Sequence, residues 1–342
     1  MSSDCRRRLG YLQARRQALA GLVVAAIGFG TAAPPARAQA DAATHFPTRA
    51  VRIVVPFPPG GSTDSTARLV AARLAKIWQQ PVTVDNKPGA AANIGTEHVA
   101  HAERDGHTML LATTALPISV ATFDRLGYDA VRDFMPVMLV STIPNVLVVN
   151  PTLPVRTIQE FVAYAKSHPG KLNFASPGAA TGQRLTFELL KQVLGIDLVH
   201  VAYKGGAPAG QAVVAGEVET MIMNIAEALP MVQASRLRAL AVTTRARAPQ
   251  LPDVPTIDET VVRGIDSSVW QGVLVPAGTP AAVVGRINAG WRQALAEGEV
   301  GGRLEDMGMH VVASSPEEFR LFLEAEIMQW TRVARTGNIK AE

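Results

Sequence analysis

Two glycines followed by hydroxyl-bearing residues, Gly60-Gly61-Ser62-Thr63, form the segment of this sequence best suited to bind an anion. Upstream, residues 51–55 are rich in β-branched side chains and predict a short buried strand, which the following prolines end. Downstream, apolar residues recur at helical spacing to about Gln79, with Ser62 or Thr63 as the expected N-cap. A helix N-terminus reached through glycines presents free N–H groups and the positive end of the helix dipole. This chemistry suits a carboxylate, although an ordinary strand-to-helix connection has the same pattern.

A second segment of the same kind lies further along the chain. Residues 173–182 run from a short predicted strand through small residues into a predicted helix, and Ser176, Gly178 and Thr181 offer amide and hydroxyl donors. Two such loops that face each other would hold one carboxylate from both sides. The alternative is a plain connection that binds nothing.

Further polar residues stand where predicted strands end. Thr113 and Thr114 follow one strand, Tyr203 and Gly205 follow another, and Asn224 ends a third. Because α/β proteins place ligands at the carboxyl ends of parallel strands, we expect these residues to lie near the binding site. The glycines beside Tyr203 lack the spacing of a Walker A loop, so we reject nucleotide binding.

Asp64 lies among the donors of the first loop and has three interpretations. An acid in the first turn of a helix commonly interacts with the dipole, whereas a second role is to accept a hydrogen bond from a ligand. A third is catalysis in an exported hydrolase, but the sequence contains no paired nucleophile and base, no G-x-S-x-G and no H-E-x-x-H. We therefore expect no enzymatic activity and no cofactor. His98 and His101 are interpreted as surface residues rather than metal ligands.

The first 38 residues predict a secretory signal peptide. Basic residues precede an uncharged apolar run, 18–33, and Ala36-Arg37-Ala38 matches an A-x-A cleavage site. Of the 33 basic and 29 acidic residues, six and one precede the cut, which leaves 27 and 28 and a net charge near −1, so nucleic acid is not an expected partner. Cys5, the only cysteine, leaves with the signal, which excludes disulfides and thiol chemistry. We expect a periplasmic protein, exported by the Sec or the Tat route.

Predicted strands and helices alternate along the mature chain, which indicates an α/β protein with two lobes around a cleft. We expect residues 41–145 to form the first part of lobe 1, residues 146–245 to form lobe 2, and residues 246–342 to return to lobe 1. Residues 134–150 are a long apolar stretch, which we predict to be two strands with a bend that cross between the lobes. The remaining predicted strands are 51–55, 81–85, 107–112, 172–175, 198–203, 220–225, 237–243 and 270–276, and the predicted helices are 63–79, 93–102, 157–167, 181–194, 207–215, 226–234, 280–296 and 315–336.

Several segments together resemble the Bug (TctC-like) receptors of tripartite tricarboxylate transporters. The resemblance lies in residues 55–68, 84–95, 105–113, 200–209 and 237–243 and covers essentially the whole mature chain in order. It implies a monomeric periplasmic binding protein of type II whose cleft holds a small carboxylate, with the membrane permease subunits of such a transporter as its partner.

Residue by residue, the resemblance carries over only in part. Residues Phe57 to Asp64 correspond to the family's first carboxylate loop, and Ser176, Gly178 and Thr181 match small polar positions of its second loop. Ala180, which we also include in the predicted site, stands where the family commonly has Gly. Arg184 stands where the family commonly has His, and it either pairs with a second carboxylate of the ligand or is a solvated helix residue. The resemblance does not transfer the identity of the carboxylate, and a receptor that signals to a membrane sensor is the alternative function.

Overall fold

The structure is a computed structural model that describes residues 46–178, 181–203, 205–296 and 298–341. The predicted signal peptide and Ala180 lie outside these ranges. The strands are β1 (Val51–Val55), β2 (Val82–Asn86), β3 (Thr108–Thr113), β4 (Phe134–Val149), β5 (Asn173–Ser176), β6 (Val199–Ala202), β7 (Thr220–Asn224), β8 (Arg238–Val242), β9 (Ser268–Pro276) and β10 (His310–Val311). The helices are α3 (Ser62–Trp78), the 3-10 helix η1 (Ala90–Ala92), α4 (Asn93–Ala100), α5 (Ala115–Thr122), α6 (Ile158–Ser167), α7 (Gly182–Leu194), α8 (Gly206–Ala215), α9 (Ile225–Gln233), α10 (Ile257–Thr260), α11 (Ala281–Ala296), α12 (Gly298–Asp306) and α13 (Pro316–Thr336).

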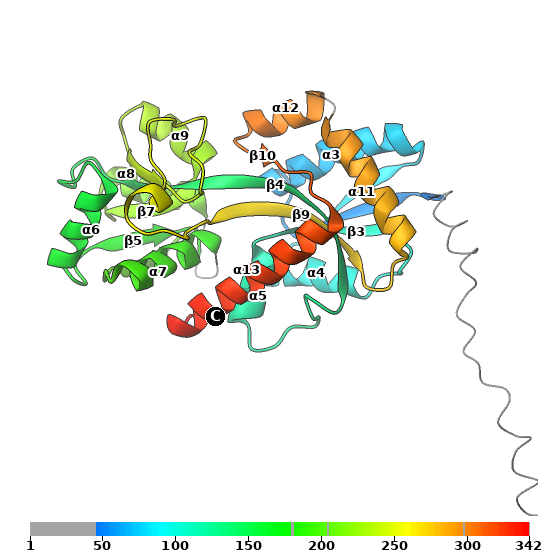
Figure 1. Ribbon diagram of the computed structural model, residues 1–342, viewed down its shortest axis with the longest axis horizontal. Helices are drawn as coiled ribbons and strands as arrows, with labels where there is room; N and C mark the ends of the chain where they lie inside the picture. Colours follow the sequence, from blue (N-terminus) through cyan, green and yellow to red (C-terminus); the bar gives the residue numbers. More distant parts are fainter. Residues whose placement is uncertain (1–45, 179–180, 204, 297, 342) are drawn as a thin grey trace, which may run out of the picture. The chain divides into compact units, whose positions relative to one another are not determined.

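The strands follow the order β2-β1-β3-β9-β4-β7-β5-β6, with β8 and β10 both paired to β4. Lobe 1 holds the parallel strands β1, β2 and β3, and β9 pairs antiparallel to both β3 and β4. Lobe 2 holds the parallel strands β5, β6 and β7, and β4 pairs antiparallel to β7 and β8. Figure 1 shows β4 and β9 running side by side between the two lobes. The predicted α/β class with two lobes is therefore confirmed.

Residues 134–149 form one strand, so the prediction of two strands with a bend is wrong. Pro144 marks the place where β4 exchanges β9 for β7 and β8 as its partners, but it does not end the strand. The register of β4 shifts between Pro136 and Met138, between Leu139 and Ser141, and between Leu147 and Val148. Because such irregularities absorb curvature and twist, the strand passes from one lobe into the other without a break.

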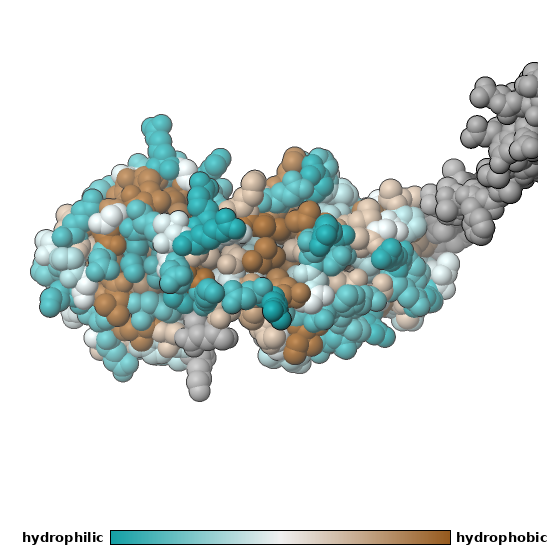
Figure 2. Space-filling view, turned by 90° about the horizontal axis from the view of Figure 1, so that it is seen from below, coloured by the Kyte–Doolittle hydropathy of each residue, from teal (hydrophilic) through white to brown (hydrophobic). Residues whose placement is uncertain are grey.

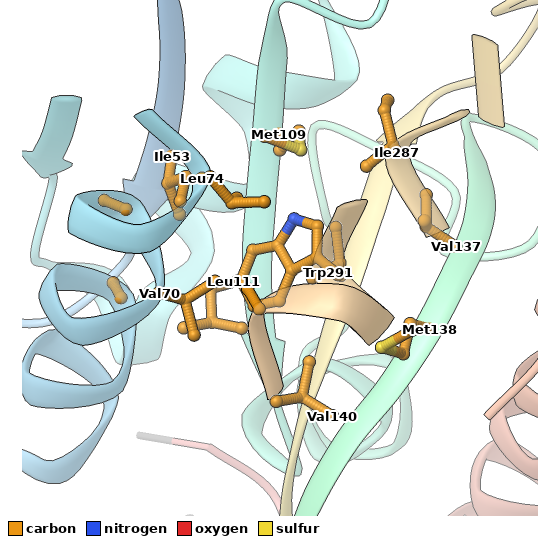
Figure 3. Packing of buried hydrophobic residues seen from close by; sticks show 14 of the residues in the cluster. Ile53, Val70, Leu74, Met109, Leu111, Val137, Met138, Val140, Ile287 and Trp291 are labelled. Atoms are coloured by element: carbon orange, nitrogen blue, oxygen red, sulfur yellow. The ribbon is translucent and has the colours of Figure 1, made fainter. Parts of the chain in front are cut away.

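Both faces of the ladder are covered in each lobe. On one face of lobe 1, Trp291 of α11 packs among Val70, Leu74, Leu111 and Met138, as Figure 3 shows. The opposite face holds a second cluster around Trp270 of β9, and lobe 2 has its own clusters on its two faces. Because the parallel strands are covered on both faces of the sheet, most of their residues are apolar.

Helix α13 also links the lobes. Trp330 and Val333 of α13 share an apolar cluster with Ile118 of α5 in lobe 1 and with Leu185 of α7 in lobe 2. Ser315 starts α13 with a capping box that involves Glu318, and the helix runs from Pro316 to Thr336, close to the predicted range 315–336. The lobes are therefore connected by two strands and by the packing of one helix.

The strand directions bring the predicted binding loops to the boundary between the lobes. β4 runs from lobe 1 into lobe 2 in the same direction as β1 and β3, because β9 is antiparallel to β3 and to β4. β5, β6 and β7 run the opposite way, because β7 is antiparallel to β4. The carboxyl ends of the parallel strands of each lobe consequently point toward the other lobe, which is the usual location of ligands in such folds.

The surface of the described residues mixes polar and apolar side chains. On the face shown in Figure 2, apolar patches on both lobes are interspersed with hydrophilic residues. Large apolar side chains that are exposed include Leu321 and Met328 of α13. Within the described ranges, no helix combines the length and apolar character that spanning a membrane requires.

Candidate functional site

The first predicted loop leads from β1 into an uncapped helix. Gly61 is the N-cap of α3, with φ −80° and ψ 173°, and no side chain caps the helix. The expectation that Ser62 or Thr63 would cap α3 is therefore wrong, since both already belong to its first turn. Gly60, Gly61 and Ser62 are exposed, whereas Thr63 is buried. The first amides of α3 have no partner within the helix, so this end is suited to an anion.

Asp64 holds this loop in place. Its carboxylate accepts hydrogen bonds from the Gly60 amide and from Arg68 Nε, both at 2.9 Å. Asn86 Nδ2 donates to Asp64 at 2.9 Å and to the Phe57 carbonyl oxygen at 3.1 Å. The loop is therefore tied to β2 and to the first two turns of α3 by one buried carboxylate.

The same contacts exclude Asp64 as a general base. The hydrogen bond from Arg68 lowers the pKa of Asp64 to about 2, against a smaller opposing effect of burial. A carboxylate that is fully ionised and already accepts three hydrogen bonds is a poor proton acceptor at neutral pH. Asp64 shapes the loop and has no role in chemistry.

The second predicted loop is organised around Ser176. Its hydroxyl lies 2.7 Å from His200 Nε2 and 2.9 Å from the Gly178 carbonyl oxygen, and the Gly178 amide donates to it at 3.3 Å. Thr181 caps α7 by accepting from the Arg184 amide, and its hydroxyl donates to Gly178. Burial, followed by the nearby charges of Arg184 and Lys191, lowers the pKa of His200 to about 4. His200 is thus neutral at pH 7 and supports the loop as a hydrogen-bonding group.

The third predicted segment lies beside the second loop. The Tyr203 amide donates to Ser176 and the Gly205 amide donates to Pro177, so β6 and its following turn pack against that loop. A Cβ added at Gly206 would lie 2.5 Å from the carboxylate of Glu227, which therefore occupies the start of α8. One of the protein's own acids thus already fills this helix N-terminus.

The lobes touch where α5 and α7 begin. A Cβ added at Gly182 would lie 3.6 Å from Thr114 Oγ1, so Thr114 of lobe 1 lies against the first turn of α7. Thr113 is buried and accepts a hydrogen bond from the Ala115 amide. Asn224 accepts a hydrogen bond from Gln183 of α7 at 3.4 Å. Residues predicted on separate lobes are therefore brought to one boundary.

Two buried carboxamides at this boundary were missed by sequence reasoning. Gln271 of β9 pairs with Thr113 and also with Ser141, and Asn145 of β4 pairs with Asn224. Directly opposed residues of antiparallel strands share a face, and Ser141 and Asn145 are four residues apart on one strand, so these side chains point to the same side of the ladder. Both amide atoms of Gln271 and the Oδ1 of Asn145 are buried without a hydrogen-bond partner. No sequence motif marks either residue, because each lies inside an apolar strand.

A separate cavity of about 660 Å³ is also lined from both lobes. Its wall includes Thr142 and Pro144 of β4, residues 244–250 of lobe 2 and residues 308–310 of lobe 1. A Cβ added at Gly308 would lie 3.1 Å from the Cβ of Ala226 in α9, so the lobes are also in contact on this side.

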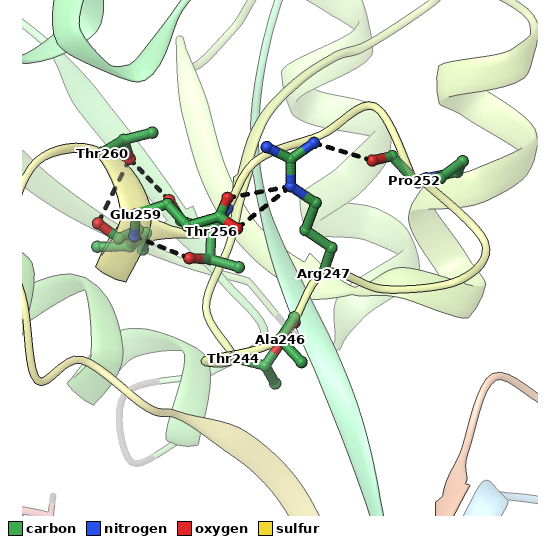
Figure 4. Close-up of polar contacts among 8 residues, drawn as sticks. Thr244, Ala246, Arg247, Pro252, Thr256, Glu259 and Thr260 are labelled. Carbon is green, nitrogen blue, oxygen red and sulfur yellow. Dashed lines mark hydrogen bonds and ion pairs between the residues drawn. The ribbon is translucent and has the colours of Figure 1, made fainter.

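The lobe 2 wall of this cavity is held by Arg247. Its guanidinium donates to Glu259 at 3.0 Å and to the Pro252 carbonyl oxygen at 3.1 Å, as Figure 4 shows. Glu259 also forms the capping box of α10 with Thr256. The loop between β8 and α10 is therefore a fixed part of lobe 2.

Arg184, His98 and His101 complete the predicted residues. Arg184 lies in the first turn of α7 and is close enough to His200 for its charge to lower the pKa of that histidine. His98 and His101 are both exposed. Within the described ranges, no group of three or more His, Cys, Asp or Glu residues has an arrangement that would hold a metal ion.

Several known proteins are similar to this chain in both sequence and fold. Residues 66–339 match the model of the tripartite tricarboxylate transporter family receptor, TctC. Protein BugT of Bordetella pertussis is 33% identical over 321 residues, which cover 93% of this chain and 98% of BugT. An R. palustris protein solved with adipate is 35% identical and superposes with a TM-score of 0.74, covering 86% of this chain and 99% of that protein. MatC from Rhodopseudomonas palustris, solved with bound malate, is 35% identical with a TM-score of 0.71 and covers 84% of this chain and 99% of its own.

These matches confirm the resemblance derived from the sequence motifs, and they run through nearly the entire described chain. They also agree with the geometry, since Asp64 is fully engaged in holding a loop and is not available as a base. The chain therefore belongs to the tripartite tricarboxylate transporter receptor family, whose members are periplasmic solute-binding receptors and not enzymes.

Proposed function

We propose that this protein captures a small carboxylate in the periplasm and delivers it to the membrane subunits of a tripartite tricarboxylate transporter. The observation that carries the proposal is the uncapped, exposed start of α3, which stands at the edge of lobe 1 that faces lobe 2. The relatives solved with adipate and with malate support a carboxylate as the class of ligand.

In this proposal, one carboxylate group of the ligand binds the amides of Gly61, Ser62 and Thr63. Hydrogen bonds to charged groups contribute about 1.5–3 kcal/mol each, so two or three of them hold an acid without a buried cation. We propose that the pocket is completed by residues at the facing strand ends, Thr113, Ser176, Gly178, Thr181 and Asn224, and is surrounded by Phe57, Asp64, Thr114, Tyr203 and Gly205.

The buried carboxamides give the proposed site a second polar group. Leaving a buried amide without a partner costs about 1–3 kcal/mol, which a hydrogen-bonding ligand would remove. The Gln271 N–H therefore favours a ligand with an acceptor at each end, such as a dicarboxylate, over a fatty acid, whereas the Asn145 oxygen would accept a hydrogen bond from a hydroxyl group of the ligand. A second carboxylate would accept from an amide N–H and avoid the cost of burying another charge on the protein.

The residues at which the chain passes between the lobes are also part of this proposal. We place the change of lobe near residue 145, where β4 changes partners, and the return to lobe 1 along β9 and α13, because Arg247, Ile257 and Ile265 still pack within lobe 2. The two lobes would close around the ligand. The permease would then meet one form of the receptor when the lobes are closed and another when they are open. We propose that the mature chain acts as a monomer after cleavage near Ala38.

Calorimetric titration of the purified mature chain tests the proposal. Adipate and malate should each bind with 1:1 stoichiometry and raise the melting temperature, whereas the neutral diamide of adipic acid should do neither. Mass spectrometry of the denatured protein should also detect a co-purified acid. The absence of heat and of any melting shift with a panel of aliphatic and aromatic acids would refute carboxylate capture.

A further inference from the structure

A basic groove lies on the outer side of the helix that carries the first binding loop. The groove has a volume of about 650 Å³ and runs between α3 and α12. Figure 1 shows these two helices next to each other in lobe 1. Four cationic side chains line it, from Arg68, Arg73, Lys76 and Arg303, against two acidic ones, from Glu299 and Asp306. Because Arg68 is paired with Asp64, the remaining lining residues leave the groove with a small excess of positive charge on a mature chain that is close to neutral.

The basic groove is accessible and partly apolar. The side chains of Arg68 and Arg303 are 54% and 59% exposed. Arg303 forms an ion pair with Glu299 at 3.5 Å, but both side chains are exposed, and such pairs contribute little to stability. Leu69 and Val300 supply apolar surface to the floor. An acidic segment with a few apolar side chains complements this combination of charge and surface.

Arg68 connects the basic groove to the first binding loop. Its Nε donates to Asp64 at 2.9 Å and its Nη2 donates to Asn86 at 3.0 Å. Asp64 in turn accepts from the Gly60 amide, and Asn86 donates to the Phe57 carbonyl oxygen. Two steps of hydrogen bonding thus join an exposed side chain in the groove to the backbone of the loop.

We propose that the basic groove is the docking surface for an acidic peptide segment of the membrane partner, and that docking loosens the first binding loop through Arg68. A carboxylate of the incoming segment competes with Asp64 for the Arg68 guanidinium. Asp64 then loses the contact that fixes its orientation, and its bond to the Gly60 amide weakens. The second half of this proposal rests on the proposed function, because it assumes that the loop holds a carboxylate ligand.

This arrangement would couple docking to release of the ligand. By linkage, a segment that weakens ligand binding is itself bound less tightly when the ligand is present, and by the same factor. The membrane partner would therefore promote discharge of the receptor that it binds, and it would bind the empty receptor more tightly than the loaded one.

The docking surface is tested with a dye-labelled peptide, Glu-Leu-Glu-Glu-Leu-Glu, by fluorescence anisotropy at low salt and without adipate. The mature chain should bind the peptide, and added salt should weaken binding. The double variant Lys76→Glu/Arg303→Glu should bind about tenfold more weakly, because reversing two charges costs about 1–2 kcal/mol. The double variant Arg332→Glu/Arg335→Glu carries the same change of charge on α13, outside the groove, and should bind as the unchanged chain does. Equal loss in both double variants, no peptide binding, or binding to anionic lipid vesicles in place of the peptide would overturn the docking surface.

The coupling is tested by repeating the adipate titration with saturating peptide. Adipate affinity should fall several-fold for the unchanged chain. In Arg68→Gln, adipate affinity should already be lower, and the peptide should change it no further. If the peptide binds but leaves adipate affinity unchanged, the coupling is refuted and the docking surface stands. If adipate does not bind at all, the proposed function and the coupling fail together, while the anisotropy measurement still decides the docking surface.

Discussion

Replacing Asp64 with asparagine tests how the first binding loop is held. The carboxylate accepts three hydrogen bonds, from the Gly60 amide, from Arg68 and from Asn86. Asparagine offers one oxygen and one NH₂ group. In either orientation of the amide, its NH₂ group faces at least one of these three donors. With one or two charge-assisted bonds lost at about 1.5–3 kcal/mol each, Asp64→Asn should destabilise the protein by about 2–4 kcal/mol. For a domain of this size we expect a fall in melting temperature of ~5–10 °C.

Thermal unfolding followed by tryptophan fluorescence measures this change, and adipate titration measures its effect on the loop. The control is Asp124→Asn, which removes an exposed ion pair with Lys340 and should change neither. Because Arg68 lowers the pKa of Asp64 to about 2, the stabilisation is present above the ordinary pKa of 3.8 and is lost as the pH falls through 2. The difference between the unchanged chain and Asp64→Asn should therefore shrink below about pH 4. A melting temperature and an adipate affinity equal to those of the unchanged chain would refute the loop's dependence on Asp64.

Two further predictions concern lobe closure and the second loop. Gly308 and Gly264 both have positive φ, but only a Cβ at Gly308 meets the other lobe, at Ala226. Each alanine substitution should cost about 1–2 kcal/mol of stability, but only Gly308→Ala should also weaken adipate binding, measured by calorimetry. Equal adipate affinities of the two variants would contradict closure at this contact. For His200, burial lowers the pKa to about 4, so the unfolded chain binds more protons between about pH 4 and 6.5 and stability falls as the pH drops through that window. In His200→Gln, which keeps a partner for Ser176, the fall in melting temperature from pH 7 to pH 5 should be smaller, and an unchanged fall would contradict this assignment.

The β1–α3 unit shows what sequence patterns could predict. Val51 to Val55 is a strand as expected, because its β-branched residues are buried in a parallel ladder, and α3 begins and ends within one residue of its predicted bounds. The capping residue was wrong for a local reason. Asp64 binds the Gly60 amide and closes the turn, so the helix begins at Ser62 with Gly61 as its cap.

The missed elements have weak local signals. Helix α5 contains Pro117 and several β-branched residues, a composition unfavourable to helices, but Pro117 lies in the first turn, where no amide bond is lost. Helix α12 begins in a glycine-rich segment, Gly298–Asp306, and is fixed by Val300 and Leu304 in the core of lobe 1. Tertiary packing decided both cases.

The candidate site was predictable only where a turn signals it. Glycines and hydroxyl residues at strand ends identified the facing loops, and the directions of the strands place them at one boundary. Gln271 and Asn145 gave no such signal, because a polar residue within an apolar strand becomes meaningful only once its register is known. Asp64 could not be assigned from sequence either, since its role depends on Arg68 and Asn86 meeting it in space.

The central claim is that backbone amides at the start of α3 hold an acid group, and deleting one amide tests it most directly. Ser62 is the first residue of α3 and the preceding Gly61 is extended, so Ser62→Pro fits the backbone and removes a single N–H. Ser62→Ala keeps that N–H and removes only the hydroxyl. In calorimetric titrations with adipate, Ser62→Pro should bind about 10–100-fold more weakly at an unchanged or higher melting temperature, while Ser62→Ala binds nearly as well as the unchanged chain. Equal adipate affinity in Ser62→Pro and the unchanged chain would contradict the claim.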